Sequence, residues 1–442
     1  MMNLRLLACV IGLISFFSNS VFAQDYNLGQ LSLNSAENLF RINSHELLIA
    51  KHMIEGAQAD AVTADQSPNP VLSLGLSNFN LNRNQGNTNS NGSNSLADQT
   101  LDFTVQINQQ FERGGKRALR LASAESGIKA SQYDFKDTLR QQKLALANAY
   151  YDLMLAQESE KVQATNVDLF EKTLQAAELR LKLGDIAFSD VARIRVDMLR
   201  GKNDLRQSTA NHQKAQSNLA YLMGREKEAG NIVASDSWPS IIVSQQDNVD
   251  VTNTDSLSLD NKLNQRADIL AAEARIQQAE QNRRSANALK TRDVGIGLEY
   301  QRFPGQEPGV GNNTLGVLLT IPLFTSYQYQ GEIARAEVNF NSALEAKAQT
   351  RATAISDMSR AHADLSAALE KVRRFDEQML TEAQKSANAT EFAYLHGAIG
   401  VTDLLDSRRV LRALQLDAVS AHADYAKSLA AWQASTNIEN SP

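Results

Sequence analysis

Four short stretches of the chain alternate apolar and polar residues, which is the pattern of a strand with one apolar face. In the first stretch Leu72, Leu74 and Leu76 alternate with serine and glycine. The pattern predicts strands over residues 70–78, 100–110, 293–301 and 314–324. Any one of them taken alone also fits an ordinary half-exposed sheet. Each has about the length that a tilted strand needs to cross a bilayer.

Four membrane strands have to close with the help of other copies, because open sheet edges are not tolerated in hydrocarbon. Two copies would supply eight strands and leave an interior filled by side chains, whereas three copies would supply twelve and leave a channel. We therefore expect a homotrimer if the strands cross a membrane.

Longer stretches follow the helical period instead. Helices are predicted over residues 31–66 and 263–289, before each pair of strands, and helical runs over 114–224 and 327–434 follow the pairs. Each long run contains a glycine, Gly184 or Gly397, followed five residues later by Ser189 or Thr402. Glycine is a common helix stop and serine or threonine a common helix start. Each run is thus predicted to be a hairpin of two long helices with coiled-coil packing.

The chain is a tandem duplication. Gly397 follows Gly184 by 213 residues, and Phe324 follows Phe111 by the same interval, while Gly297 follows Gly75 by 222. The predicted organisation is a first repeat over 24–224, an irregular linker over 225–261 lying against the helices near mid-length, a second repeat over 262–435, and a tail over 436–442.

The N-terminal segment has the pattern of a Sec signal peptide over residues 1–23, with Arg5, an apolar run and a small-residue end at Ala23. The only cysteine, Cys9, lies inside it in a weak lipoprotein-like box, so lipidation stays an open alternative. The mature chain, beginning near Gln24, then has no cysteine for disulfides or thiolate metal sites.

Composition and motifs narrow the class of function. The net charge of −6 argues against a nucleic-acid partner. The sequence contains no nucleophile elbow, zincin, phosphate-loop or dinucleotide motif, so we expect no enzyme activity and no cofactor. The six histidines form no ligand pair, and no metal site is predicted. His396 beside the second tip could meet its copies in a trimer, or simply be a helix-end histidine.

The order of signal peptide, helix, strand pair and helical hairpin, repeated twice, resembles the TolC-like outer-membrane efflux proteins, also called outer membrane factors. The resemblance rests on Pro68-Asn69-Pro70, on Ile321-Pro322-Leu323-Phe324 and on the two tips. In addition, the segment from Phe111 to Arg117, FERGGKR, resembles the cobalt-zinc-cadmium branch of heavy-metal efflux systems.

The resemblance implies a mainly α fold with a small β part. It implies a trimeric twelve-stranded β-barrel in outer-membrane lipid, continued by an α-helical barrel that spans the periplasm of a Gram-negative bacterium. The implied partners are a periplasmic adaptor, or membrane fusion protein, and a proton-driven inner-membrane pump of the RND type.

The resemblance also implies a periplasmic gate at the tips, formed by Tyr394, Asp403, Asp406 and, from the first tip, Asp190. Rings of aspartates at a narrow bore would attract cations and repel one another. For Asp190 and Asp403 the alternative is a helix N-terminal acid that favours the dipole. The sequence departs from the family pattern at Ile399, which replaces an arginine that links neighbouring hairpins, and Arg408 or Arg409 could serve instead.

Apolar residues on an exposed turn predict a contact surface for the adaptor at the tips. Its residues are Gly184, Ile186, Phe188, Gly397, Ile399 and Val401. The resulting function is a passive exit duct for heavy-metal cations. The alternatives are a duct for drugs or for type I protein secretion and, from another class, a soluble periplasmic coiled-coil scaffold or adaptor.

Overall fold

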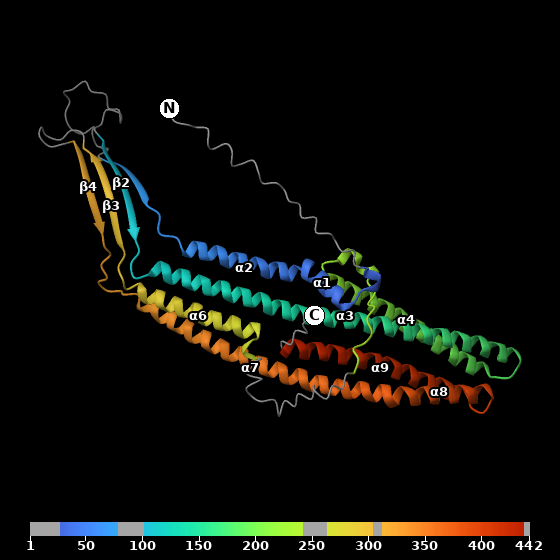
Figure 1. Ribbon diagram of the computed structural model, residues 1–442. Coiled ribbons are helices and arrows are strands. Elements are labelled where there is room, and N and C mark those ends of the chain that lie inside the picture. The colour runs from blue at the N-terminus through green and yellow to red at the C-terminus, as the bar shows by residue number, and fades with distance from the viewer. Residues whose placement is uncertain (1–26, 78–100, 242–262, 304–311, 437–442) are drawn as a thin grey trace, which may run out of the picture.

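The computed structural model describes residues 27–77, 101–241, 263–303 and 312–436. It is a long, gently curved molecule with a four-stranded sheet at one end and two helical hairpin tips at the other (Figure 1). The signal segment, most of the first interstrand loop and much of the linker lie outside the described residues.

The first repeat begins with two helices, where the sequence predicts a single helix over 31–66. Ser44 separates them with an extended backbone, φ −60° and ψ 125°, and it is buried. The break lets Leu39 and Phe40 turn into the core, a tertiary advantage that helical periodicity does not reveal. The elements of this repeat are α1 (Leu33–Asn43), α2 (His45–Ala64), β1 (Val71–Ser77), β2 (Asp102–Phe111), α3 (Lys116–Lys182) and α4 (Phe188–Leu222).

The second repeat contains the same parts, with a π-helical turn in its outgoing helix. Its fourth strand ends at Thr320 and not at residue 324 as predicted, two residues before Pro322, which has no N–H to donate to a sheet. The elements are α6 (Ala267–Ala288), β3 (Val294–Arg302), β4 (Asn313–Thr320), α7 (Gln330–Arg374), the π-helix η5 (Phe375–Met379), α8 (Leu380–Leu395) and α9 (Val401–Thr436).

The sheet is antiparallel throughout, in the order β1-β2-β3-β4. Leu74 pairs with Val105, and Ile296 pairs with Leu319. Ile296 follows Leu74 by 222 residues, as predicted, but Leu319 follows Val105 by 214. The second strands therefore correspond at 214, whereas Gly184 and Gly397 at the tips correspond at 213.

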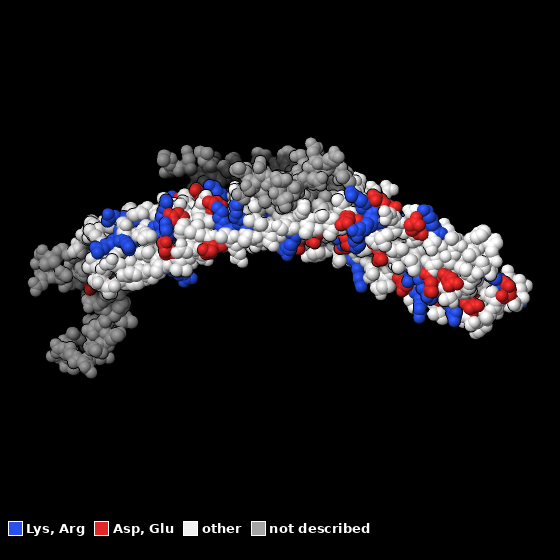
Figure 2. Space-filling view, turned by 90° about the horizontal axis from the view of Figure 1, so that it is seen from below, with Lys and Arg blue, Asp and Glu red and all other residues white. Residues whose placement is uncertain are grey.

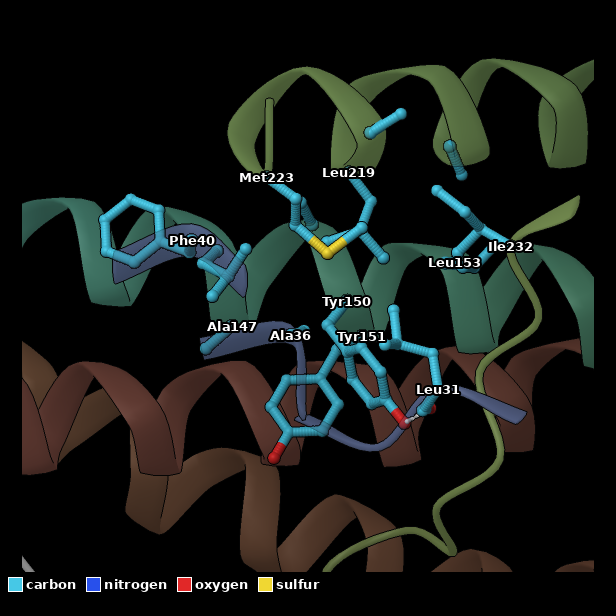
Figure 3. Packing of buried hydrophobic residues seen from close by; sticks show 14 of the residues in the cluster. Leu31, Ala36, Phe40, Ala147, Tyr150, Tyr151, Leu153, Leu219, Met223 and Ile232 are labelled. Atoms are coloured by element: carbon cyan, nitrogen blue, oxygen red, sulfur yellow. Dashed lines mark hydrogen bonds between the residues drawn. The ribbon is translucent and has the colours of Figure 1, made fainter. Parts of the chain in front are cut away.

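The largest apolar cluster lies near mid-length, where α1, α3 and α4 meet (Figure 3). Tyr150 is fully buried there and donates a hydrogen bond from its hydroxyl to the Leu31 carbonyl at 2.8 Å. The start of the linker, including the short 3₁₀ helix η4 (Glu226–Asn231), lies against this cluster. Trp238 stacks between Tyr151 and His422, at ring distances of 6.4 and 6.0 Å, and so joins the two repeats.

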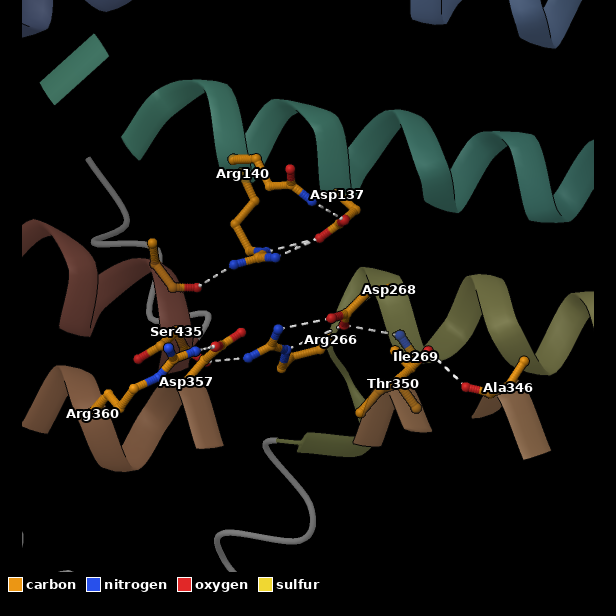
Figure 4. A network of polar contacts seen from close by, with 12 residues as sticks. Asp137, Arg140, Arg266, Asp268, Ile269, Ala346, Thr350, Asp357, Arg360 and Ser435 are labelled. Carbon is orange, nitrogen blue, oxygen red and sulfur yellow. Dashed lines mark hydrogen bonds and ion pairs between the residues drawn. The ribbon is translucent and has the colours of Figure 1, made fainter. Parts of the chain in front are cut away.

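Two arginines, of which Arg266 is buried, secure the C-terminal end of α9 between the repeats (Figure 4). Arg266 is 2% exposed, pairs with Asp268 at 2.7 Å and donates to the Ser435 carbonyl at 3.1 Å. Arg140 of α3 donates to the Ala434 carbonyl at 3.2 Å. Such contacts satisfy the carbonyls that every helix leaves free at its C-terminus.

The segment from Phe111 to Arg117 forms the joint between sheet and helices. Gly114 and Gly115 both have positive φ, 76° and 69°, and a Cβ on Gly114 would lie 2.8 Å from Thr291. Lys116 is buried and pairs with Asp293 at 2.8 Å. The charged side chains at each end of the segment are also paired: Arg120–Glu112 at 2.6 Å and Arg117–Asp65 at 3.0 Å.

None of the helices in the described residues combines the length and the apolar character needed to cross a membrane. On the face seen in Figure 2, basic and acidic side chains are interspersed along the helical part. Many of them form ion pairs along or between neighbouring helices, such as Arg275 with Asp134.

Candidate functional site

Each hairpin tip is closed by the same backbone turn. Gly184 has φ 78°, its N–H bonds to the Leu181 carbonyl at 3.0 Å, and the next N–H, of Asp185, bonds to the Arg180 carbonyl at 2.9 Å. The second tip repeats the pattern around Gly397, with φ 71° and bonds of 3.1 and 2.9 Å. This is the Schellman arrangement, in which a left-handed glycine ends the helix. The predicted stop signals are confirmed.

The predicted start signals are wrong by one to two residues. Ser189 and Thr402 are the second residues of α4 and α9, not caps. Ala187 occupies the cap position of α4 without a side-chain hydrogen bond. The Thr402 hydroxyl instead accepts a hydrogen bond from Arg193 of α4 at 3.1 Å, so its role is tertiary.

An apolar cluster lies directly behind the tips and draws in several of the predicted site residues. Tyr394 and Val401 are buried in it, Val401 to 5% exposure, and Ile186 and Ile399 pack against it partly buried. Val401 therefore cannot offer the exposed adaptor contact predicted for it. Phe188 is 68% exposed and keeps that possibility. The other buried members are Phe170, Ala177, Val191, Ile194, Leu404 and Leu405.

The three predicted gate aspartates lie at the starts of the return helices. Asp190 is in the first turn of α4 and is half-buried, while Asp403 is in the first turn of α9 and is exposed. Both positions also suit an acid that favours the helix dipole. Asp406 is exposed and pairs with Arg409 of the same helix at 2.9 Å.

Arg409 joins the two hairpins of one chain. Besides Asp406 it binds both carboxylate oxygens of Asp197 on α4, at 2.9 and 2.7 Å. The Asp197 side chain is only 7% exposed, and its hydrogen bond raises the pKa of the Arg409 guanidinium above the ordinary value despite partial desolvation. One turn further, Arg412 of α9 pairs with Asp204 of α4 at 2.8 Å. No sequence pattern marks Asp197 as the partner of Arg409, because a contact between distant segments leaves no local signal.

Arg408 is buried in the seam between the hairpins. It pairs with Glu391 of α8 at 3.1 Å and donates to the Thr173 hydroxyl of α3. Burial lowers the pKa of its guanidinium below the ordinary value, and the Glu391 carboxylate opposes that shift. Tyr394 lies close by, with Arg180 of α3 over its ring at 5.4 Å. Arg408 and Arg409 thus both have partners within one protomer.

The described residues contain no group of three or more His, Cys, Asp or Glu side chains arranged to hold a metal ion. His396 is exposed at the second tip, and its Nδ1 lies 2.8 Å from the Phe392 carbonyl. A meeting of His396 with its copies stays a prediction.

Comparison with known proteins gives a consistent result. Residues 38–225 and 259–437 match the family described as outer membrane efflux protein. The cobalt-zinc-cadmium resistance protein CzcC of Cupriavidus metallidurans is 23% identical over 87% of this chain and 84% of its own length. The pyoverdine export outer membrane protein OpmQ of Pseudomonas aeruginosa is 24% identical over 86% of this chain and 79% of its own.

Among solved structures, the outer membrane protein VceC of Vibrio cholerae has the same fold. The TM-score is 0.71, with 21% identity, 91% of this chain and 95% of the other being covered. The matched family covers both repeats, with their sheets, hairpins and tips. The chain belongs to the outer membrane efflux protein family.

Proposed function

We propose that three copies of this chain form the outer-membrane channel of a tripartite efflux system, a passive exit duct for heavy-metal cations. The observation that carries the proposal is the exposed apolar face of the sheet. Two rows cross all four strands on this face: Leu72, Ile107, Leu298 and Val317, and beside them Leu74, Val105, Tyr300 and Leu315. Most of these side chains are exposed in the single chain, which suits contact with lipid.

The sheet edges support closure by further copies. Within the described residues β1 and β4 are each paired on one side only. A lipid-exposed edge would leave backbone groups without partners, and three chains would close the sheet with twelve strands. The helical hairpins would then continue the wall of the duct on the periplasmic side.

The tips are the proposed contact for a periplasmic adaptor, which in turn binds a proton-driven pump of the RND type. Phe188 is the strongest candidate, because its large aromatic side chain at the start of α4 is 68% exposed within the described part of the chain. Gly184, Gly397, Ile186 and Ile399 would shape the surface around it. Asp403 and Asp406, exposed near the start of α9, would form acidic rings at the closed bore.

Cations are favoured as cargo by the name of the CzcC relative and by these acidic rings. The segment from Arg113 to Arg117 adds nothing to this argument, because Lys116 and Arg117 pair with Asp293 and Asp65 in the joint between sheet and helices. A second candidate, export of a siderophore or drug, is favoured by the pyoverdine export relative.

Deletion of the gene, with sensitivity measured to zinc, cadmium, cobalt, copper and a drug panel, tests the cargo. We expect lower metal tolerance, restored by the intact gene, and unchanged drug tolerance. Lower drug tolerance with normal metal tolerance would support the second candidate. Extraction of the protein without detergent, and absence of heat-modifiable trimers on gels, would instead support a soluble periplasmic scaffold.

A further inference from the structure

Within one chain, a polar seam joins the return helix of the first hairpin to that of the second. Asp197 of α4 binds Arg409 of α9 at 2.7 and 2.9 Å. On either side of this pair, Arg193 donates to Thr402 at 3.1 Å and Arg412 pairs with Asp204 at 2.8 Å. These contacts are made by one side of each hairpin, so the opposite sides are left open.

The duplication identifies what stands on those open sides. Near the tips, residues of the two repeats correspond at the interval of 213 set by Gly184 and Gly397. The correspondence extends to side-chain contacts. Arg195 pairs with Glu178 at 2.7 Å, and their counterparts, Arg408 and Glu391, pair at 3.1 Å. The two tips are therefore alike in local structure, and a contact of one predicts a contact of the other.

The burial of Arg408 shows how the side of a hairpin that contacts the other hairpin differs from the side that does not. Arg408 is buried because it reaches across the seam to the Thr173 hydroxyl of α3. Its counterpart Arg195 keeps 48% of its side chain exposed. The counterpart of Thr173 is Ser386, an exposed hydroxyl on α8. Arg195 bonds only to Glu178 within the described residues, and the exposed Ser386 offers the hydroxyl acceptor that corresponds to Thr173.

The ion pair between Asp197 and Arg409, which joins the two hairpins within one chain, corresponds to two apolar residues. The position of Arg409 in the second repeat corresponds to Val196 in the first, and the position of Asp197 corresponds to Val410. These valines are 48% and 56% exposed, and Leu199, one turn beyond Val196 on α4, is 52% exposed. The two valines are chemically complementary. Asp406, the counterpart of Arg193, is already engaged by Arg409, and Leu199 and Asp417, the counterparts of Arg412 and Asp204, do not complement each other.

We propose that Val196 of one copy packs against Val410 of the next copy. This contact would form a seam between copies that corresponds to the seam between α4 and α9 within one chain. This inference rests on the proposed function, since it takes the copies to form a closed ring. The same seam joins Arg195 to Ser386. Because the two patches differ, the contact is heterologous, and repeating it closes a ring. The seam within a chain is held by ion pairs and the seam between chains by an apolar contact.

Cysteine cross-linking of the full-length protein in membranes tests the contact. Val196→Cys combined with Val410→Cys should give covalent dimers and trimers on oxidation, because a disulfide needs Cβ atoms about 4 Å apart. Either substitution alone should give little cross-linked product, since in a heterologous ring a cysteine does not meet its own copies. Leu179→Cys with Phe392→Cys is the matched control, because both are exposed and correspond between repeats but are not predicted partners.

A second pair of variants transplants the inner ion pair. Val196→Arg with Val410→Asp should keep the trimer. Its dissociation temperature should fall as the salt concentration rises, because salt screens a surface ion pair. Val196→Asp with Val410→Asp should weaken the trimer even at low salt.

The outcomes separate the two proposals. A trimer by light scattering whose Val196 and Val410 cysteines cross-link no better than the control pair overturns the seam and leaves the proposed function standing. Cross-linking by one cysteine alone indicates an isologous contact and also overturns it. A chain that is monomeric in detergent overturns both.

Discussion

The joint between sheet and helices depends on one buried ion pair, and its removal is a quantitative test. In Asp293→Asn the carboxylate that accepts from Lys116 at 2.8 Å is lost. The Lys116 side chain is 9% exposed and would keep only the Thr291 carbonyl, 2.9 Å from Nζ, as partner. The variant also weakens the hydrogen bond from the Arg113 N–H, which lies 3.0 Å from Asp293.

Breaking a buried pair typically costs about 3–5 kcal/mol, because one charge is left without a partner. Asp293 is 19% exposed, so water can replace part of its role. We therefore expect a loss of about 2–3 kcal/mol, between the buried-pair value and that of a hydrogen bond to a charged group. The matched control is Asp65→Asn, which breaks the half-exposed pair with Arg117 and should cost less than about 1 kcal/mol.

Thermal unfolding of the purified protein in detergent, followed by circular dichroism, measures both variants. Adding Lys116→Met to Asp293→Asn should recover part of the loss, because no uncompensated charge remains. Equal melting temperatures for the Asp293 and Asp65 variants would refute the reasoning, since the two pairs differ mainly in burial.

The same pair predicts a pH dependence. Partial burial alone would raise the pKa of Asp293, but hydrogen bonds from Lys116 and the Arg113 N–H outweigh it and hold that pKa below its ordinary value. A depressed carboxylate pKa stabilises the fold above the unfolded-state value of about 3.9, and the contribution is lost as pH falls through the folded value. The stability gap between wild type and Asp293→Asn should therefore be full at pH 7 and shrink below about pH 4.

Three further predictions concern the tips and the glycines. Asp403→Ala with Asp406→Ala should raise the resting conductance of the channel in planar bilayers; unchanged conductance would remove both residues from the gate. Arg409→Gln should also raise it, because α4 and α9 lose their bidentate link, and a normal closed state would show that this link is not a lock. In Gly184→Ala the added Cβ meets no neighbouring atom, so the variant should cost only the strain of a left-handed residue, about 1–2 kcal/mol. Gly114→Ala adds a clash with Thr291 and should lower the melting temperature further. A lower melting temperature for Gly184→Ala than for Gly114→Ala would contradict this reasoning.

Much of the fold could be predicted, because the helices and strands follow from local periodicity and the same order of elements occurs twice. Alternation marks all four strands to within a few residues, apart from the end of β4, and Gly184 and Gly397 mark both tips. The break at Ser44 could not be predicted, since its residues suit a helix and only the packing of Phe40 requires the turn.

The site was less predictable, because its contacts join residues about 200 positions apart. Arg409 was recognisable as a candidate link, but Asp197, its partner, is one acid among many on a polar helix. Val401 was misjudged for a related reason. An apolar residue beside a turn can face solvent or the core, and only the packing of the neighbouring hairpin decides between them.

The π-helical turn at Phe375–Met379 determines which face of the following helix α8 points toward the neighbouring helices. Before the turn, buried residues of α7 repeat at intervals of seven, as at Ala354, Ala361 and Ala368. Beyond the π-helix, whose Phe375 is also buried, the buried residues Ala387 and Tyr394 follow Val372 by 15 and 22 positions, each one more than a multiple of seven. One added residue would turn an α-helix by about 100°. By absorbing that residue in a wider turn, the π-helix keeps Tyr394 directed into the apolar cluster behind the tip rather than along the outer surface of the hairpin.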